Sequence, residues 1–332
     1  MTGEINFKIK VGEKIIQTFI PIRPSKSSNP REHALQYLDP VFVADTLKDD
    51  IVTRTAIPDL LGGTEPGYAG VILYGPAGTG KTVLLEAIGD VYRACGAYAK
   101  ELSESSLSSP YVSMFAKNIE NEFILALKEA KERGKPSFLG FDEASALAQD
   151  PSEGANTVSK LYQETLDVMK RYIGNQRTVV VGISTNLSPD SFDEALTREG
   201  RLTSFLIDYP DAEQRKRMLK YFAGKHQVLT LTDEQASQMA EKIPAAQGAF
   251  IEEFCRTYRQ ARATALLKER GYSTLVDALK HGASVTADDV TRTITFDTLR
   301  ADLEATLRAR HTRDGKTVGS NPIGFNPNTY QK

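Results

Sequence analysis

Gly75–Thr82 combines glycines, a lysine and a threonine in a spacing that suits the binding of a phosphate group. Small residues let successive backbone N–H groups curl around a phosphate, and the positive end of a following helix adds to the attraction. Lys81 would reach the outer phosphates of a nucleotide, and the Thr82 hydroxyl would bind Mg²⁺. The alternative is an ordinary glycine-rich turn. The residues predicted to contact the nucleotide here are Gly75, Pro76, Ala77, Gly78, Thr79, Gly80, Lys81, Thr82 and Val83.

Two adjacent carboxylates, Asp142 and Glu143, follow the apolar run Phe138–Phe141. At the end of a strand beside the phosphate loop, Asp142 would hold Mg²⁺ through its water shell, and Glu143 would polarise the attacking water. On its own, an acidic pair after a strand is usually just the start of a loop. Together with the upstream loop it predicts a catalytic site in which Thr82 and Asp142 bind the metal.

The phosphate loop lies in a region that alternates short apolar strands with periodic helices. This alternation predicts a parallel sheet with helices on both faces, the α/β fold of P-loop nucleotide hydrolases. After Pro210 the strand signals fade, which predicts a smaller all-helical lid domain. The predicted strands are 71–74, 137–141 and 178–184, and the predicted helices are 82–93, 119–133, 158–172, 212–223, 232–242, 249–268, 273–280 and 287–310.

Changes in composition predict four regions along the 332 residues. A possible β-hairpin and a proline- and serine-rich linker precede the α/β region, and a stretch rich in Gly, Asn, Pro and Thr follows the last helix. We therefore predict an N-terminal arm over 1–40, with hairpin strands at 5–10 and 14–19, an α/β ATPase domain over 41–210, a helical lid over 211–310 and a flexible tail over 311–332.

Charge and hydropathy exclude several classes of protein. Lys and Arg number 41 against 43 Asp and Glu, and the net charge of −2 predicts no overall attraction to nucleic acid or to an anionic membrane. The apolar runs are far shorter than the roughly 18 residues of a membrane-spanning helix, so we expect a cytoplasmic protein. Cys95 and Cys255 have no ligand partner at a suitable spacing, and the four histidines form no cluster. Neither residue type predicts a metal site.

The segment after the strand 178–184 resembles the second region of homology of AAA ATPases. It contains Asn186, the run Asp193–Arg201, Tyr209-Pro210-Asp211 and Arg215. The resemblance spans roughly residues 41–300, with four motifs in the expected order, and it is to the clade of proteasomal ATPases, katanin, spastin and the unfoldases. It implies ATP and Mg²⁺ as cofactors and a homo-oligomeric ring of six subunits.

The resemblance also assigns residues. Asn186 matches the polar sensor that orients the attacking water or contacts the γ-phosphate, and Arg198 and Arg201 match paired arginine fingers that act on the nucleotide of the neighbouring subunit. Two arginines at this spacing would otherwise be an ordinary solvated surface. Gly248 and Ala249 match a Gly-Ala step that brings the first helical turn of the lid close to the nucleotide, where the alternative is a plain helix start.

Tyr111 and Val112 match the family's pore loop, which grips a polypeptide in the central channel. Ser113 stands where the family usually has Gly, and Phe115 is a second candidate for the gripping aromatic. Core residues beside a helix are the alternative for all of them. The resemblance thus implies a ring-forming ATPase that remodels or unfolds a protein by pulling it through a pore; the substrate is unknown. An ATP-switched assembly factor with low turnover is the second hypothesis, and a nucleic-acid motor the least favoured.

Overall fold

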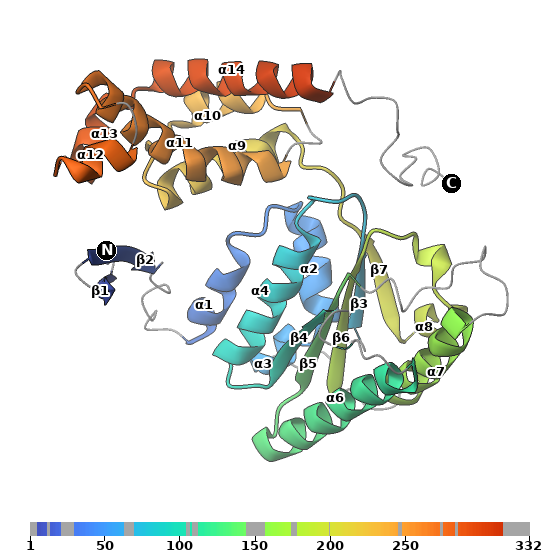
Figure 1. Cartoon of the computed structure of the whole chain (residues 1–332). Helices are drawn as coiled ribbons and strands as arrows, with labels where there is room; N and C mark the ends of the chain where they lie inside the picture. Colours follow the sequence, from blue (N-terminus) through green and yellow to red (C-terminus); the bar gives the residue numbers. More distant parts are fainter. Residues whose placement is uncertain are drawn as a thin grey trace. The chain divides into compact units, whose positions relative to one another are not determined.

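The computed structural model describes residues 5–11, 14–20, 30–62, 70–103, 107, 112–143, 157–173, 178–198, 200–244, 248–272, 275–282 and 285–314 (Figure 1). The chain divides into two compact units. The first comprises Met1–Val41, Asp49–Ile72 and Thr82–Ser204, and the second comprises Phe42–Lys48, Leu73–Lys81 and Phe205–Lys332. The predicted domain boundaries at residues 40, 210 and 310 stay a prediction.

The N-terminal hairpin is confirmed. Strand β1 (Ile5–Val11) pairs antiparallel with β2 (Lys14–Ile20), in a register that joins Ile5 to Ile20 and Val11 to Lys14. Short helices follow before the main sheet: α1 (Pro30–Leu35), η1 (Gln36–Leu38), α2 (Asp45–Arg54) and α3 (Ile57–Leu60).

The central sheet has five strands in the order β4-β5-β6-β3-β7. Its strands are β3 (Gly70–Tyr74), β4 (Ala99–Ser103), β5 (Ser137–Asp142), β6 (Val179–Thr185) and β7 (Leu202–Leu206). Strand β5 pairs in parallel with β4 and with β6, so the carboxyl ends of these three strands lie at one edge of the sheet. The predicted α/β fold is confirmed, although the sequence patterns missed β4 and β7.

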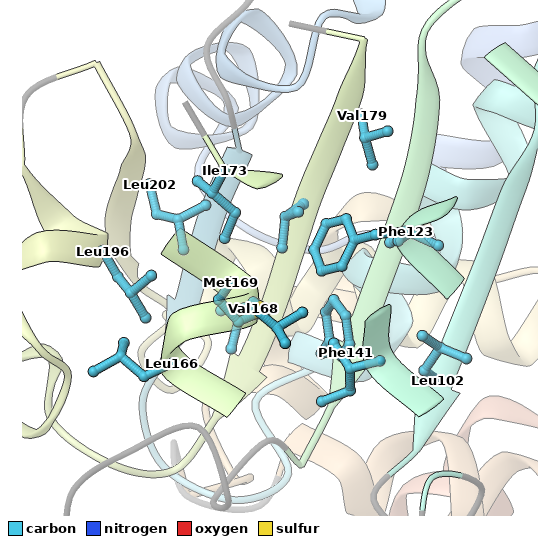
Figure 2. Close-up of a cluster of buried hydrophobic side chains, with 14 of the residues drawn as sticks. Leu102, Phe123, Phe141, Leu166, Val168, Met169, Ile173, Val179, Leu196 and Leu202 are labelled. Atoms are coloured by element: carbon cyan, nitrogen blue, oxygen red, sulfur yellow. The ribbon is translucent and has the colours of Figure 1, made fainter. Parts of the chain in front are cut away.

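One face of the sheet packs against two long helices, α6 (Val112–Arg133) and α7 (Thr157–Tyr172). Figure 2 shows this core, in which Phe141 of the sheet and Phe123 of α6 have ring centroids 6.2 Å apart and Met169 of α7 lies beside them. Alternate residues of β5 and β6 point into it, as the period of two in a strand requires. Most of the stability of this unit comes from this buried apolar surface.

The opposite face carries a depression formed by two glycines that lie side by side, Gly140 of β5 and Gly182 of β6. Leu85 of α4 (Lys81–Ala94) occupies it together with the ring of Phe138. A Cβ on Gly182 would lie 2.5 Å from Leu85 Cδ1, and a Cβ on Gly140 would lie 3.1 Å from Leu85 Cγ. The helix that starts at the phosphate loop therefore packs closer to the sheet than larger residues would allow.

The described residues of the second unit after Pro210 are mainly helical, with α9 (Ala212–Lys225), α10 (Asp233–Ala240), α11 (Gly248–Glu269), α12 (Leu275–Lys280), α13 (Ala287–Thr293) and α14 (Phe296–Asp314). Their apolar faces form a separate buried cluster that includes Leu219, Ile251 and Leu303. Asp211 and Thr232 begin α9 and α10 with capping boxes, in which each side chain accepts a backbone N–H of the first turn.

The prediction of one helix over 287–310 is wrong. Ile294 is extended, and Thr295 and Thr298 exchange hydrogen bonds between their hydroxyls and backbone N–H groups, with distances of 3.0 and 3.2 Å. A threonine that satisfies free N–H groups in this way starts a new helix at Phe296. The helix predicted over 119–133 also begins earlier, at Val112.

Among the helices in the described ranges, none combines the length and the apolar character that a membrane span needs.

Candidate active site

The phosphate loop leaves β3 and enters α4 with a backbone that only glycine adopts easily. Gly75, Gly78 and Gly80 have φ values of +144°, +78° and +95°. A Cβ on Gly75 would also collide with the carbonyl oxygen of Ile207, so this position requires glycine for space as well as for conformation. The Thr79 hydroxyl donates to the Pro76 carbonyl at 3.0 Å and fixes the turn.

Lys81 is the first residue of α4, and only 7% of it is exposed. Its Nζ donates to the carbonyl oxygens of Gly75 at 3.0 Å and Pro76 at 2.6 Å. The ammonium group therefore lies against the inner side of the loop, where backbone oxygens compensate its burial. Among the predicted loop residues, Ala77, Gly78, Gly80, Thr82 and Val83 are exposed, and Gly75 and Pro76 are buried.

Thr82 and Asp142, the two predicted metal ligands, are brought together. The Thr82 hydroxyl, in the first turn of α4, donates to Asp142 Oδ1 at the end of β5 at 3.0 Å. The residues lie sixty positions apart in the sequence, and the close packing of α4 on the sheet gives them this contact. Two oxygen ligands in one place suit a hard cation such as Mg²⁺.

Ser184 is a third member of this group, and the sequence analysis missed it. It is 2% exposed in β6, and its hydroxyl donates to the same Asp142 Oδ1. The same Ser184 oxygen accepts the backbone N–H of Glu143 at 3.4 Å. Only the register of β5 and β6, which sets Ile183 beside Phe141, reveals this neighbour, so no sequence motif could have identified it.

Glu143 and Asn186 follow directly after two neighbouring parallel strands, and both are exposed. Glu143 has a φ of +52°, a left-handed conformation that costs a residue with a side chain roughly 1–2 kcal/mol. Strain of this kind gathers at functional sites, where the surrounding structure holds the residue in place. Here the bond from the Glu143 N–H to Ser184 contributes to holding it.

The charge around this edge of the sheet is negative. Glu86, one turn after Thr82 on α4, has a raised pKa, first because it is partly buried and then because of the carboxylates of Glu101, Asp142 and Asp90. A cation bound near Asp142 would relieve this repulsion. Among the residues with described positions, no group of three or more His, Cys, Asp or Glu is placed to hold a metal ion.

The two predicted arginine fingers have different surroundings. Arg198 follows α8 (Glu194–Thr197), and its side chain is 66% exposed and forms a loose ion pair with Glu194 at 3.9 Å. Arg201 is half-buried, and its guanidinium donates to the carbonyl of Ala195 in α8. Arg198 is therefore available to a neighbouring molecule, and Arg201 also holds its own loop.

Helix α8 is fixed by Asp193, whose carboxylate accepts the Ala195 N–H at 2.7 Å and the Lys170 ammonium at 3.3 Å. Partial burial opposes ionisation of Asp193, but these two hydrogen bonds outweigh it and hold its pKa below the usual value. The segment that bears both arginines is thus held in place by the contact between Asp193 and Lys170 of α7.

Gly248 and Ala249 begin α11 within the second unit. Gly248 is buried, and a Cβ there would lie 2.7 Å from Pro210 Cγ. Ala249 Cβ lies 3.6 Å from where a Cβ on Gly78 would be, so this helix start lies near the phosphate loop. The approach of these two residues to a bound nucleotide stays a prediction.

The predicted pore residues are only partly described. Tyr111 lies outside the described residues, and Val112 is the first residue of α6. Phe115, the second candidate for the gripping aromatic, is 6% exposed and belongs to the core of the first unit. That candidate role is wrong for Phe115, because three residues into α6 its ring faces the sheet.

Residues 71–207 match the family model for the ATPase family associated with various cellular activities (AAA). This stretch of the chain is therefore an AAA domain, the domain of the AAA family of ATPases. The predicted family is thereby confirmed, and membership of it implies nucleotide binding.

Three curated relatives match this AAA protein over similar stretches. It is 28% identical to cell division protein C of Sulfolobus acidocaldarius over 207 residues. This stretch makes up 61% of this chain and 53% of the relative. It is 28% identical over 219 residues to human fidgetin-like protein 1, 65% of this chain and 31% of the relative. It is 27% identical over 209 residues to human vacuolar protein sorting-associated protein 4A, 62% of this chain and 45% of the relative. The chain therefore spans about half or less of the length of these relatives.

Replacing Ser184 by alanine tests its link to Asp142 in the AAA domain. We expect the Mg²⁺ concentration for half-maximal nucleotide binding to rise roughly tenfold, because a hydrogen bond to a charged group contributes about 1.5–3 kcal/mol. Ser137→Ala is the matched control, since Ser137 is a fully buried serine of the neighbouring strand whose hydroxyl donates to the Ala126 carbonyl at 2.8 Å. Both variants should lower the melting temperature, but only Ser184→Ala should change the Mg²⁺ dependence; equal Mg²⁺ curves would refute the link.

Proposed function

We propose that this AAA protein is a Mg²⁺-dependent ATPase that assembles into a ring and uses hydrolysis to remodel a protein partner. The observation that carries the proposal is the hydrogen bond from Thr82 to Asp142, because it joins the start of the phosphate-loop helix to the end of β5. ATP is the proposed nucleotide, with the backbone N–H groups of Gly75–Thr82 around its phosphates and Lys81 on its outer phosphates.

Thr82 and Asp142 would hold Mg²⁺ together with the phosphates, since Mg²⁺ keeps several waters and takes one or two protein oxygens. When bound, the ion would neutralise charge on the phosphates. Ser184 holds Asp142 in position for this task, and Lys81 would exchange the Gly75 and Pro76 carbonyls for phosphate oxygens as its acceptors.

Glu143 would take a proton from the attacking water, and the Asn186 amide would orient that water. Both residues are exposed at the ends of neighbouring strands, which supports their reaching the same small molecule. Partial burial, and after it the negative charge of the surrounding carboxylates, raises the pKa of Glu86, and these carboxylates would favour a cation beside them.

The proposed ring is based on the predicted arginine fingers, Arg198 and Arg201. A guanidinium that is 66% exposed, such as that of Arg198, can serve a nucleotide bound to a second copy of the chain. A head-to-tail contact of this kind closes into a ring if its rotation allows. We propose six subunits, and Tyr111 and Val112 as the residues that grip the protein substrate in the pore. The relatives named for cell division and for vacuolar protein sorting suggest a protein substrate, whose identity this proposal leaves open.

Lys81→Met tests the nucleotide site. We expect the affinity for ATP to fall roughly tenfold to hundredfold, because a charge-assisted hydrogen bond to a phosphate is lost. Phosphate release should fall with it, and the ATP-dependent increase in particle mass should disappear in mass photometry. Lys242→Ala, at an exposed lysine of the second unit, is the control and should behave as wild type. Unchanged ATP affinity in Lys81→Met would remove the phosphate loop from the mechanism.

A further inference from the structure

A groove of about 680 Å³ lies within the second unit, between α11 and α14. Phe250, Phe254 and Tyr258 of α11 form its floor, with 4%, 5% and 4% of each residue exposed. Ala261 of α11 and Ala305 of α14 line it as exposed residues with small side chains. Small residues at the rim keep an aromatic floor within reach of another chain segment.

The groove also carries polar groups of both signs. The Tyr258 hydroxyl donates to Asp302 Oδ2 at 3.1 Å, and Glu253 is a second carboxylate along the lining. Arg262 lies beside them, and its Nε is buried without a hydrogen-bond partner among the residues that the structure describes. Two carboxylates and one arginine therefore line a groove with an aromatic floor.

We propose that residues 315–332, which follow α14 directly, lie in this groove of their own chain. The distances agree with this. Thr306, which lines the groove, is eight residues before Asp314, about 12 Å along a helix, and the four residues 315–318 cover about 13 Å when extended. Residues 318–325 then extend over about 26 Å, close to the roughly 22 Å of α11 between Phe250 and Ala265.

The chemistry of the segment is complementary to that of the groove. Residues 318–325, the stretch placed along the groove, carry no charged side chain, so they bring no carboxylate next to Glu253 and Asp302. Ile323 and Phe325 supply apolar side chains for the aromatic floor. Pro322 before them favours an extended backbone, which suits a groove that runs along a helix.

Photo-cross-linking of the full-length chain tests the proposal. Phe325 is replaced by the photoreactive analogue p-benzoylphenylalanine, the protein is irradiated, and the linked peptides are identified by mass spectrometry. We expect cross-links to the stretches of α11 and α14 that line the groove, in a product with the mass of one chain.

Ala261→Trp, which fills the groove, should abolish these cross-links. Gln260→Trp is the matched control, because Gln260 is an exposed neighbour on α11 that does not line the groove, and it should leave them unchanged. If Ala261→Trp melts early, Ala305→Trp closes the groove from the other wall. Cross-links elsewhere, cross-links that both groove variants leave unchanged, or a product with the mass of two chains would each overturn the proposal.

Discussion

Glu143→Gln is expected to reduce ATP hydrolysis by about 10²–10⁴-fold, the contribution usual for a general base. Glutamine keeps the size of the side chain but cannot accept a proton from water. ATP binding should persist, since the loop, Lys81 and Thr82 are unchanged. Steady-state phosphate release and equilibrium binding of a fluorescent ATP analogue measure the two effects separately, and loss of both together would contradict the role.

The backbone of Glu143 offers an internal control. Its φ of +52° is one that glycine adopts without penalty, so Glu143→Gly should lose hydrolysis to the same extent while the stability stays equal or rises by up to about 1 kcal/mol. A residue kept only for structure would show the opposite pattern, with lower stability and intact hydrolysis. Thermal melting of both variants beside their turnover makes this comparison.

Arg198→Ala is expected to reduce hydrolysis by roughly 10³-fold or more, the effect of losing an arginine that acts on a neighbouring nucleotide. Because this side chain is 66% exposed, the melting temperature should not change. Arg201→Ala should lose hydrolysis and also melt earlier, since its guanidinium donates to the Ala195 carbonyl.

Mixing two inactive variants decides whether Arg198 acts between subunits. In an equal mixture of Arg198→Ala and Glu143→Gln chains, about a quarter of the sites in a head-to-tail ring combine an intact Glu143 with an intact Arg198 from the next chain. Activity should return to about that fraction of the wild-type value. A mixture that stays as inactive as its components would mean that the arginine serves its own chain or no site.

The sequence predicted elements well where one pattern dominated. The run Thr178–Ser184 has no charged residue and is rich in valine and isoleucine, and it became the fully buried strand β6, shifted by one residue to Val179–Thr185. Strand β4 was missed because it contains Lys100 and Glu101, which read as a surface segment. These residues form ion pairs with Glu122 and Arg93 on neighbouring helices, a compensation that only the tertiary structure reveals.

The residues of the candidate site also fall into two groups, those that lie in a local sequence motif and those that only the tertiary structure reveals. Lys81, Thr82, Asp142 and Glu143 lie in local motifs whose chemistry is readable from spacing alone. Ser184 lacks such a motif, because its contacts cross from one strand to the next at a distance of forty-two residues in sequence. Phe115 was left with two alternatives for a related reason: an aromatic residue beside a predicted loop looks accessible until the start of α6 is known, and the structure shows the core residue.

The depression formed by Gly140 and Gly182 has a consequence for how this sequence can diverge. Leu85, Phe138 and the two glycines come from a helix and two strands, yet they share one closed volume. A methyl group gained at Gly182 has to be offset by a smaller side chain at position 85 or 138, or α4 moves and carries Thr82 away from Asp142. Descendants of this chain are therefore expected to replace Gly182 only together with Leu85 or Phe138.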